Sequence, residues 1–349
     1  MKQQHRCLFT AIILFVGVLV GCSPVSSTSH SPFTDETITV NIAYGNHPGE
    51  PVDQLAHKWK ELAEERSEGR LQLNLYPSSQ LGSEADVVEQ AKLGSNVIIL
   101  TGYDFLMNFA PDVGVMTAPY LVDDFDELFA LTETDWFEEQ RSQLQQQGLD
   151  IVTTNTIYGE RHLMTTREVN TPEDLKGMKI RVPNNPMYIG TFRVLGASPT
   201  PLPLADMYTS LQQGVIDGAE NPLPVLAGAK TNEVAKHLTL TGHTKIISPW
   251  VTGTPFIDSL PDELEKILRE SGDDAGEYAK AIVVSEEKRV LKKFKEQGIQ
   301  INEIDQEPFQ QRAKGIYEEM DEWSPDLQQT IEALLADIRS DGDERGGNN

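Results

Sequence analysis

The chain has 349 residues, of which 39% are hydrophobic, and it carries 54 acidic against 29 basic side chains, for a formal net charge of −25. Nucleic acid is excluded as a partner, because binding to phosphates requires a basic face. The length is sufficient for two domains, and two cysteines give no disulfide framework to supplement the core.

The first residues predict export from the cytoplasm. Lys2 and Arg6 form a short positive region, and the apolar run from Cys7 to Val20 follows it. This run is about 14 residues long, short of the roughly 20 that a membrane-spanning helix needs. Residues 1–21 are therefore predicted to be a signal peptide, and a transmembrane anchor is the less favoured alternative.

The signal peptide ends in a sequence that resembles the lipobox of bacterial lipoproteins, Leu19-Val20-Gly21-Cys22. The resemblance implies cleavage before Cys22 and a lipid on its thiol, which would anchor the protein to a membrane outside the cytoplasm. Residues 22–36 are rich in Ser, Thr and Pro and are predicted to form a flexible tether.

From Thr37 onward, strand and helix patterns alternate along the chain. The predicted elements are strand 37–44, helix 52–67, strand 71–76, helix 84–93 and strand 97–100. This order predicts an open α/β sheet with helices on both faces, in which a ligand binds at the carboxyl ends of the strands.

A second α/β unit is predicted after a helical stretch at 126–147. Its elements are strand 150–155, a crossing segment at 158–166, a short helix capped by Thr171, strand 178–182, helix 202–213 and the short strand 215–217.

The later part of the chain is predicted to be helical. One helix runs from 261 to about 297, which is long enough to lie across both units. Two further helical segments follow between 307 and 339, and the polar residues 341–349 are predicted to be a disordered tail.

Catalytic and metal-binding patterns are absent from the sequence. It has no glycine-rich loop followed by Lys-Ser/Thr, no His-Glu-x-x-His and no Gly-x-Ser-x-Gly motif, and its seven histidines never approach metal-ligand spacing. With 54 carboxylates, a pair at catalytic spacing would arise by chance. The chain is therefore predicted not to be an enzyme and to need no metal or cofactor.

Two arginines and one asparagine are candidates for binding an anion. Arg181 and Arg161 each lie where a strand gives way to a loop, and an arginine fork can hold a carboxylate through two parallel hydrogen bonds. Asn221 is fixed in an extended conformation by Pro222. The alternatives are that each arginine pairs with one of the many surface acids and that Asn221 is a turn residue.

Three stretches resemble the solute receptors of TRAP transporters, the tripartite ATP-independent systems typified by C4-dicarboxylate and sialic acid uptake. They are YPSSQLGSE at 76–84, TPEDLKGMKIRVP at 171–183 and LGASPTPLPLADMYTSLQQGVIDGAENP at 195–222. The resemblance implies a periplasmic-binding-protein-like α/β fold with two lobes, a hinge between them and a long helix that spans both. Lobe I would comprise 37–158 and about 247–286, and lobe II would comprise 159–246 and about 287–340.

The resemblance also implies roles for individual residues. Arg181 would pair with the ligand carboxylate, Arg161 would lie beside it, and Asn221 would complete the clamp. Three residues of the other lobe would reach the distal polar end of the ligand: Asn46, His47 and Glu84. A membrane permease would receive the ligand from the receptor, which is expected to be a monomer.

Two departures from the sialic acid receptors bear on the ligand. Leu204 stands where those receptors place an aromatic residue, and Gly102 stands where they place an acid. We therefore expect a sugar acid, such as a hexuronate, an aldonate or a keto sugar acid, in preference to a C4 dicarboxylate. There are two rival classes. The absence of a paired nucleophile and base argues against a secreted sugar-acid enzyme with the same fold, whereas a sensory receptor that presents its closed form to a chemosensor or kinase would have the same residues and stays open.

Overall fold

The computed structural model describes residues 37–346, with side chains up to Asp341. The predicted signal peptide, the lipobox with Cys22 and the tether lie outside the described residues, as do residues 347–349. Between residues 37 and 346, no helix is both long and apolar enough to cross a membrane.

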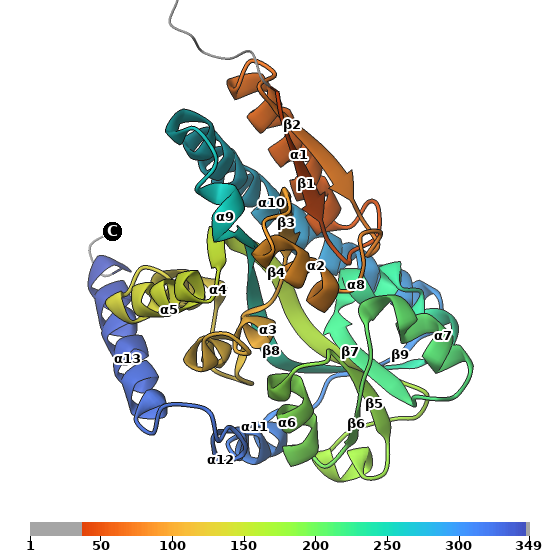
Figure 1. Ribbon diagram of the computed structural model, residues 1–349. Coiled ribbons are helices and arrows are strands. Elements are labelled where there is room, and N and C mark those ends of the chain that lie inside the picture. The colour runs from red at the N-terminus through yellow and green to blue at the C-terminus, as the bar shows by residue number, and fades with distance from the viewer. Residues whose placement is uncertain (1–36, 347–349) are drawn as a thin grey trace, which may run out of the picture. The chain divides into compact units, whose positions relative to one another are not determined.

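The strands of the described chain form one mixed sheet (Figure 1). Their order is β2-β1-β3-β8-β4-β7-β5-β6, and β9 pairs with β8 outside this path. The strands are β1 (Ile38–Ala43), β2 (Leu71–Tyr76), β3 (Val97–Leu100), β4 (Leu149–Thr165), β5 (Lys179–Val182), β6 (Ser198–Pro201), β7 (Gly218–Pro222), β8 (His237–Gly253) and β9 (Gln300–Asn302). We call the β1–β3 part the first half of the sheet and the β5–β7 part the second half; within each half the strands are parallel.

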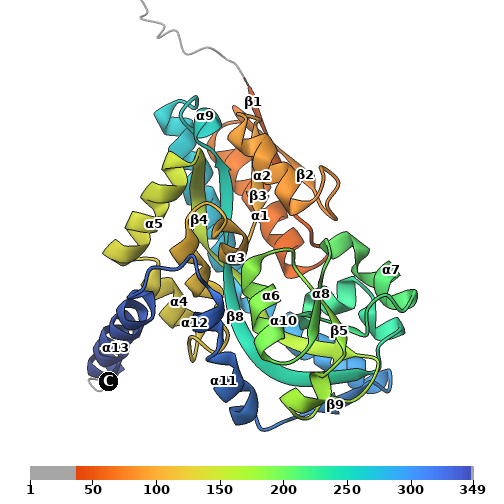
Figure 2. The same cartoon turned by 60° about the horizontal axis from the view of Figure 1, so that its bottom comes forward.

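Two long antiparallel strands, β4 and β8, connect these halves. Each has 17 residues, and Figures 1 and 2 show them side by side between the two halves. Their ladder shifts register four times, and one shift falls between Ile157 and Gly159. Gly159 has a φ of +130°, a conformation that side chains disfavour. The middle of the sheet is therefore its least regular part, and such irregularities allow strands to bend there.

Helices cover both faces of the first half. Ile98 and Leu100 of β3 enter a core cluster with α1 and α10, whereas Val97 and Ile99 enter a different cluster with α2 and α3. Because successive strand residues point to opposite faces, the two clusters lie on opposite sides of the sheet. Burial on both faces explains why β3 is a continuous apolar run, and it confirms the predicted α/β class.

The helices begin at clear sequence signals, such as Pro51 in the first turn of α1 and the Ser83/Asp86 capping box of α2. The α-helices are α1 (Pro51–Arg66), α2 (Glu84–Lys92), α3 (Tyr103–Leu106), α4 (Phe125–Leu131), α5 (Asp135–Gln146), α6 (Pro186–Val194), α7 (Met207–Gln212), α8 (Leu223–Gly228), α9 (Thr254–Ile257), α10 (Asp262–Glu296), α11 (Glu307–Ala313), α12 (Ile316–Glu319) and α13 (Leu327–Gly346). Short 3-10 turns are η1 (Pro111–Thr117), η2 (Pro172–Leu175), η3 (Leu204–Asp206) and η4 (Thr231–Glu233).

The 35-residue helix α10 confirms the predicted long helix. Its beginning belongs to a core cluster of the first half and its end to a cluster of the second half. Gly272 and Gly276 let it approach β4, because a Cβ added at these positions would lie 2.6 Å from Thr153 and 2.1 Å from Asn155. These glycines therefore allow close packing of α10 on the sheet.

Two predicted boundaries in the middle of the chain differ from the structure. The strand predicted at 150–155 and the crossing at 158–166 form one continuous strand, β4, because Gly159 absorbs the irregularity without ending the ladder. The helix predicted at 126–147 is two helices, α4 and α5. They are separated at Thr134, whose side chain accepts a hydrogen bond from Phe137 N and so begins α5.

Other differences concern shorter segments. The prediction of a strand at 215–217 is wrong, because β7 begins at Gly218. Asp217 precedes the strand, and its carboxylate accepts a 2.8 Å hydrogen bond from Lys179 N. Three helices lie in 307–346 where two segments were expected, and α13 continues through 341 to Gly346, within the predicted tail.

Helix α13 packs on α4, beside α5 (Figure 1). Trp323, just before α13, donates from Nε1 to Pro111 O at 3.0 Å, and Arg339 Nε donates to Glu127 Oε1 at 2.6 Å. Residues assigned from the sequence to lobe II thus contact residues assigned to lobe I.

Candidate functional site

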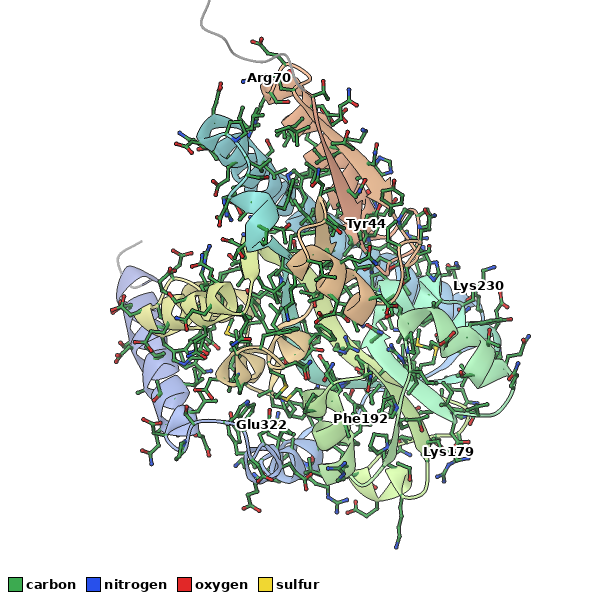
Figure 3. All side chains as sticks on the ribbon, in the orientation of Figure 1. Tyr44, Arg70, Lys179, Phe192, Lys230 and Glu322 are labelled. Carbon is green, nitrogen blue, oxygen red and sulfur yellow. The ribbon has the colours of Figure 1, made fainter. Side chains whose placement is uncertain are left out.

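A cavity of about 290 Å³ lies where the carboxyl ends of the parallel strands of both halves meet. Arg70, just before β2, and Lys179, at the start of β5, lie on opposite sides in Figure 3, while Tyr44, after the end of β1, lies between them. Strands from the two halves therefore run toward one another. The cavity occupies the position that the α/β pattern predicted for a ligand.

Five of the six predicted binding residues line this cavity: Asn46, Glu84, Arg161, Arg181 and Asn221. His47 does not line it, because its Nδ1 lies 3.1 Å from Ser78 Oγ instead. Burial lowers the pKa of His47, and the positive charge of Lys230 lowers it further. His47 is thus a loop-supporting residue in this arrangement, held beside the cavity wall.

Arg161 already has a counterion within the fold. Its Nε and Nη2 donate to the two carboxylate oxygens of Glu220, each at 2.5 Å, and its guanidinium carbon lies 4.4 Å from the centre of the Tyr188 ring. Both members of the ion pair are buried. Burial alone would lower the pKa of Arg161, but the Glu220 charge more than offsets this and raises it.

Glu220 is completely buried and has a second partner in His243, whose Nε2 lies 3.3 Å from Glu220 Oε2. Burial would raise the pKa of Glu220, but Arg161 and His243 together lower it. Sequence reasoning missed Glu220, although it directly precedes Asn221 in the quoted motif. A buried carboxylate with such partners stays ionised and neutralises the charge of Arg161.

Arg181, in contrast, has no counterion among the described residues. Its Nε and Nη2 both donate to the Leu202 carbonyl, at 2.9 and 2.7 Å, and only 3% of the residue is exposed. Burial lowers the pKa of Arg181 to about 10, while the charge of Glu220 opposes the shift and that of Arg161 adds to it. A buried cation without an anionic partner is costly in a folded protein. Among the described residues no carboxylate is in direct contact with Arg181, although the charges of Glu220 and Glu84 act on it from farther away.

Asn221 lies beside Arg181 with an unused polar atom. Arg181 pairs with Ala219 in the β5–β7 ladder, so Asn221, two residues farther along β7, is on the same face. Only 2% of Asn221 is exposed, and its Oδ1 has no hydrogen-bond partner in residues 37–346. Buried polar groups are rarely left unpaired, so this amide also indicates a missing partner in the cavity.

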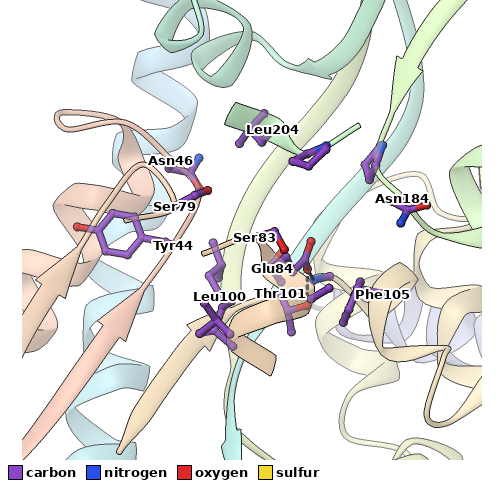
Figure 4. Close-up of a pocket in the computed structure, with 18 of the residues that line it drawn as sticks. Tyr44, Asn46, Ser79, Ser83, Glu84, Leu100, Thr101, Phe105, Asn184 and Leu204 are labelled. Atoms are coloured by element: carbon purple, nitrogen blue, oxygen red, sulfur yellow. Dashed lines mark hydrogen bonds between the residues drawn. The ribbon is translucent and has the colours of Figure 1, made fainter. Parts of the chain in front are cut away.

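The first half of the sheet supplies acidic groups to the same cavity. Glu84, at the start of α2, accepts hydrogen bonds from Thr101 Oγ1 and from Gly102 N, the latter at 3.2 Å, and Figure 4 shows it beside Thr101. Burial raises the pKa of Glu84, an effect that the two hydrogen bonds oppose.

Asp104 is a second acid in this wall and was not predicted. It accepts a 2.5 Å hydrogen bond from Asn185 Nδ2, and Asn185 in turn caps α6 by accepting from Tyr188 N. A Cβ at Gly102 would lie 1.8 Å from Asp104 Oδ1. Gly102 was expected to remove an acid here, but the Asp104 carboxylate takes the adjacent space. Burial, followed by the Glu84 charge, raises the pKa of Asp104 to about 7.

Asn46 and Leu204 complete the side of the cavity near β1 (Figure 4). The Asn46 Nδ2 group donates to Glu50 Oε2 at 2.8 Å, which orients the amide. Burial raises the pKa of Glu50 to about 7. Leu204 comes from the second half and meets the β1 loop, since a Cβ at Gly45 would lie 3.2 Å from Leu204 Cδ2.

The arrangement is that of a recognition site. It offers one uncompensated guanidinium, one unpaired amide and several hydroxyl and carboxylate groups. In the part of the chain that the structure describes, no cluster of His, Cys, Asp and Glu could hold a metal ion.

Known proteins resemble this chain over most of its length. The family model for bacterial extracellular solute-binding proteins, family 7, matches residues 42–322. The sialic acid-binding periplasmic protein SiaP of Vibrio cholerae is 32% identical over 258 residues, which cover 74% of this chain and 80% of that protein.

Two solved structures are similar over most of the chain. A TRAP periplasmic solute-binding protein from Ochrobacterium anthropi, with bound L-fuconate, is 43% identical with a TM-score of 0.84, covering 86% of this chain and 99% of that one. Another, from Actinobacillus succinogenes 130Z with bound L-galactonate, is 40% identical with a TM-score of 0.84. The match covers 86% of this chain and 100% of that one.

Proposed function

Because the chain belongs to the bacterial extracellular solute-binding proteins of family 7, the solute receptors of TRAP transporters, we propose that it captures a sugar acid outside the cytoplasm. An aldonate, a hexuronate or a keto sugar acid would bind in the cavity and be delivered to the membrane permease. Members of this family transport solutes, and we propose that the bound acid is released unchanged. We also propose that the receptor is monomeric and that lipid on Cys22 anchors it.

The observation that carries the proposal is the missing counterion of Arg181. A ligand carboxylate would supply it through charge-assisted hydrogen bonds. The Nδ2 group of Asn221 can donate to the same carboxylate, whereas its unpaired Oδ1 would accept from a hydroxyl group of the ligand. Arg161 would add positive charge beside this carboxylate, although Glu220 occupies two of its nitrogens.

The size and lining of the cavity support a sugar acid. Its volume of about 290 Å³ is at the small end of the roughly 300–1,000 Å³ of ligand pockets, which suits a six-carbon acid. Serine, threonine and carboxylate groups, which can recognise hydroxyls, line the remainder together with apolar side chains such as Leu100, Phe105 and Leu204. The two relatives with bound L-fuconate and L-galactonate support the same class.

We propose that the ligand holds the two halves together. Contacts cross the cavity at Asp104 with Asn185 and at the β1 loop with Leu204, so the walls enclose a ligand only when the halves are close. The irregular middle of β4 and β8 is where they would bend. A ligand that contacts both walls favours this closed state over an open one.

Binding assays with protein that begins at Ser23 would test this function. Thermal-shift measurements would screen aldonates, hexuronates, keto acids and C4 dicarboxylates, because a ligand that binds only the folded state stabilises it by about 2.7 kcal/mol at 100 times its Kd. Titration calorimetry would then compare the wild type with Arg181→Ala and with Arg193→Ala, a control in which a surface ion pair to Glu319 is lost.

We expect a sugar acid to bind, Arg181→Ala to weaken it at least 100-fold and Arg193→Ala to have no effect. Full affinity in Arg181→Ala, or a panel in which no sugar acid binds, would overturn the proposal.

A further inference from the structure

The acidic wall of the cavity restricts the ligand further. Resting on the proposed capture of a sugar acid, we propose that the ligand carries a single carboxylate. Glu84 and Asp104 accept hydrogen bonds from hydroxyl groups at its other end and exclude a second carboxylate.

The free oxygen atoms of this wall require donors. Glu84 uses Oε1 to accept from Thr101 and Gly102, and no described residue donates to its Oε2. Asp104 uses Oδ2 to accept from Asn185, while its Oδ1 lies against Gly102, another residue of the cavity lining. In their ionised form these carboxylates are acceptors only, so their partners in the ligand are hydroxyl groups.

The cations of the cavity are sufficient for one carboxylate. Arg161 and Arg181 are the only lysine, arginine or histidine residues among the described residues that line it, and Glu220 already neutralises Arg161. Arg181 remains for the ligand. A second ligand carboxylate would be buried beside Glu84 and Asp104 without a cation, which adds like-charge repulsion to the cost of desolvation. Specificity of this kind rests on a repulsive element as well as an attractive one.

The position of Asp104 links this wall to closure. Asp104 follows β3 in the first half, whereas its donor Asn185 precedes α6 in the second half. The wall is therefore complete only when the halves are together, and the ligand hydroxyls gain these acceptors in the closed state alone.

A matched pair of ligands tests the inference. The tightest sugar acid of the panel is compared with the aldaric acid of the same carbon chain, for example galactonate with galactarate, which differ only in a carboxylate at C6. Titrations at pH 8 use the wild type, Glu84→Gln and Asp104→Asn. Glu89→Gln is the control, since Glu89 is on the same helix but exposed and paired with Lys92.

We expect the wild type to bind the aldaric acid at least 100-fold more weakly than its partner. Glu84→Gln and Asp104→Asn should each weaken the sugar acid about tenfold and reduce the discrimination to less than tenfold, while Glu89→Gln changes neither. The two substitutions keep the size of the side chain, and melting curves without ligand verify that each variant is folded.

The outcomes separate this inference from the proposed function. Three outcomes would overturn the single-carboxylate inference. They are equal affinity of the wild type for the sugar acid and its aldaric acid, tight binding of a C4 dicarboxylate, and an affinity ratio of the two acids that is unchanged in both Glu84→Gln and Asp104→Asn. If Arg181→Ala still abolished binding in that case, capture through Arg181 would stand. Absence of binding by every sugar acid would overturn the proposed function and the inference with it.

Discussion

Arg161 and Arg181 lie in the same cavity and are both almost completely buried, yet their surroundings differ. Arg161 has the carboxylate of Glu220 and the face of Tyr188 as neighbours. The Arg181 nitrogens, in contrast, donate only to the carbonyl of Leu202 within the described part of the chain. The fold supplies a bonded carboxylate to Arg161 and, among the described residues, none to Arg181. Burial therefore does not distinguish the two arginines, but the presence of an internal carboxylate does, and in the proposed function a ligand carboxylate pairs with Arg181.

The largest effect should come from removing the internal counterion. We expect Glu220→Gln to lower the free energy of unfolding by about 3–5 kcal/mol, because Arg161 would stay buried and charged without an ionic partner. Denaturant unfolding without ligand measures this. Glu173→Gln is the control, since it breaks the exposed pair with Arg312 and should cost less than about 1 kcal/mol. If both variants lost a similar free energy of unfolding, the buried pair of Arg161 and Glu220 would be no more important for stability than an exposed ion pair.

A carboxylate introduced beside Arg181 should give this arginine an internal counterion, as Glu220 does for Arg161. In Asn221→Asp, the new carboxylate lies on the face of Arg181 and replaces the ligand as its counterion. We expect affinity for the sugar acid to fall at least 100-fold, about 2.7 kcal/mol, while the melting temperature without ligand rises. Calorimetric titration and melting curves measure the two effects. Asn232→Asp, at an exposed amide bonded to Gln297, should leave affinity unchanged, and tight binding by Asn221→Asp would contradict the comparison.

Glu50 extends the comparison to a buried anion without a cation. Among the described residues, its carboxylate accepts hydrogen bonds only from the Asn46 amide and His47 N. Burial raises its pKa to about 7 from an ordinary 4.5. Between these values the folded state keeps a proton that the unfolded state releases, so stability falls as pH rises from about 4.5 to 7 and changes no further above that.

Unfolding of the wild type and Glu50→Gln at pH 5 and pH 8 checks this expectation. From pH 5 to pH 8, the free energy of unfolding of the variant should increase by about 1–3 kcal/mol relative to that of the wild type. Glu61→Gln, at an exposed position on α1, serves as the control. A difference that does not vary with pH would show that Glu50 keeps its charge in the fold.

The smallest effect is expected for the stability of Arg181→Met without ligand. Since no carboxylate is lost and an unpaired buried cation is removed, the free energy of unfolding should fall by less than about 1 kcal/mol or rise. Arg161→Met, in contrast, would leave the buried Glu220 with only His243 as a charged partner and should lower it. Denaturant unfolding of the two variants in parallel gives the difference directly. A loss of several kcal/mol in Arg181→Met would assign that arginine a structural role.

Local patterns in the sequence predicted the first half of the fold well. β2 and β3 match their predicted limits, and α1 and α2 match within one residue, because period-two and helical spacing with good caps define them locally. Arg181 and Asn221 were singled out because they lie in motifs at strand ends, and both lie near the ends of their strands. Arg161 was also expected at a strand end, but it lies inside β4, where β7 and β8 pair with it on both sides.

Long-range pairings were not predictable in the same way. Glu220 meets Arg161 across 59 residues and Asp104 meets Asn185 across 81, so no local spacing signals either contact. β4 was divided in the prediction because Gly159 interrupts its pattern, whereas its pairing with β8 and β7 keeps it continuous.

The shared strands β4 and β8 also govern how this protein folds. Val251 of β8 pairs with Ile99 of β3, which lies 152 residues earlier in the chain, so the first half cannot be joined to the rest of the sheet until β8 is present. Contacts of such high sequence separation slow folding. The two halves should consequently form and melt in a single cooperative transition, and fragments cut between β4 and β8 should fail to fold separately. For an exported chain, slow completion of the sheet favours passage through the membrane in an unfolded state.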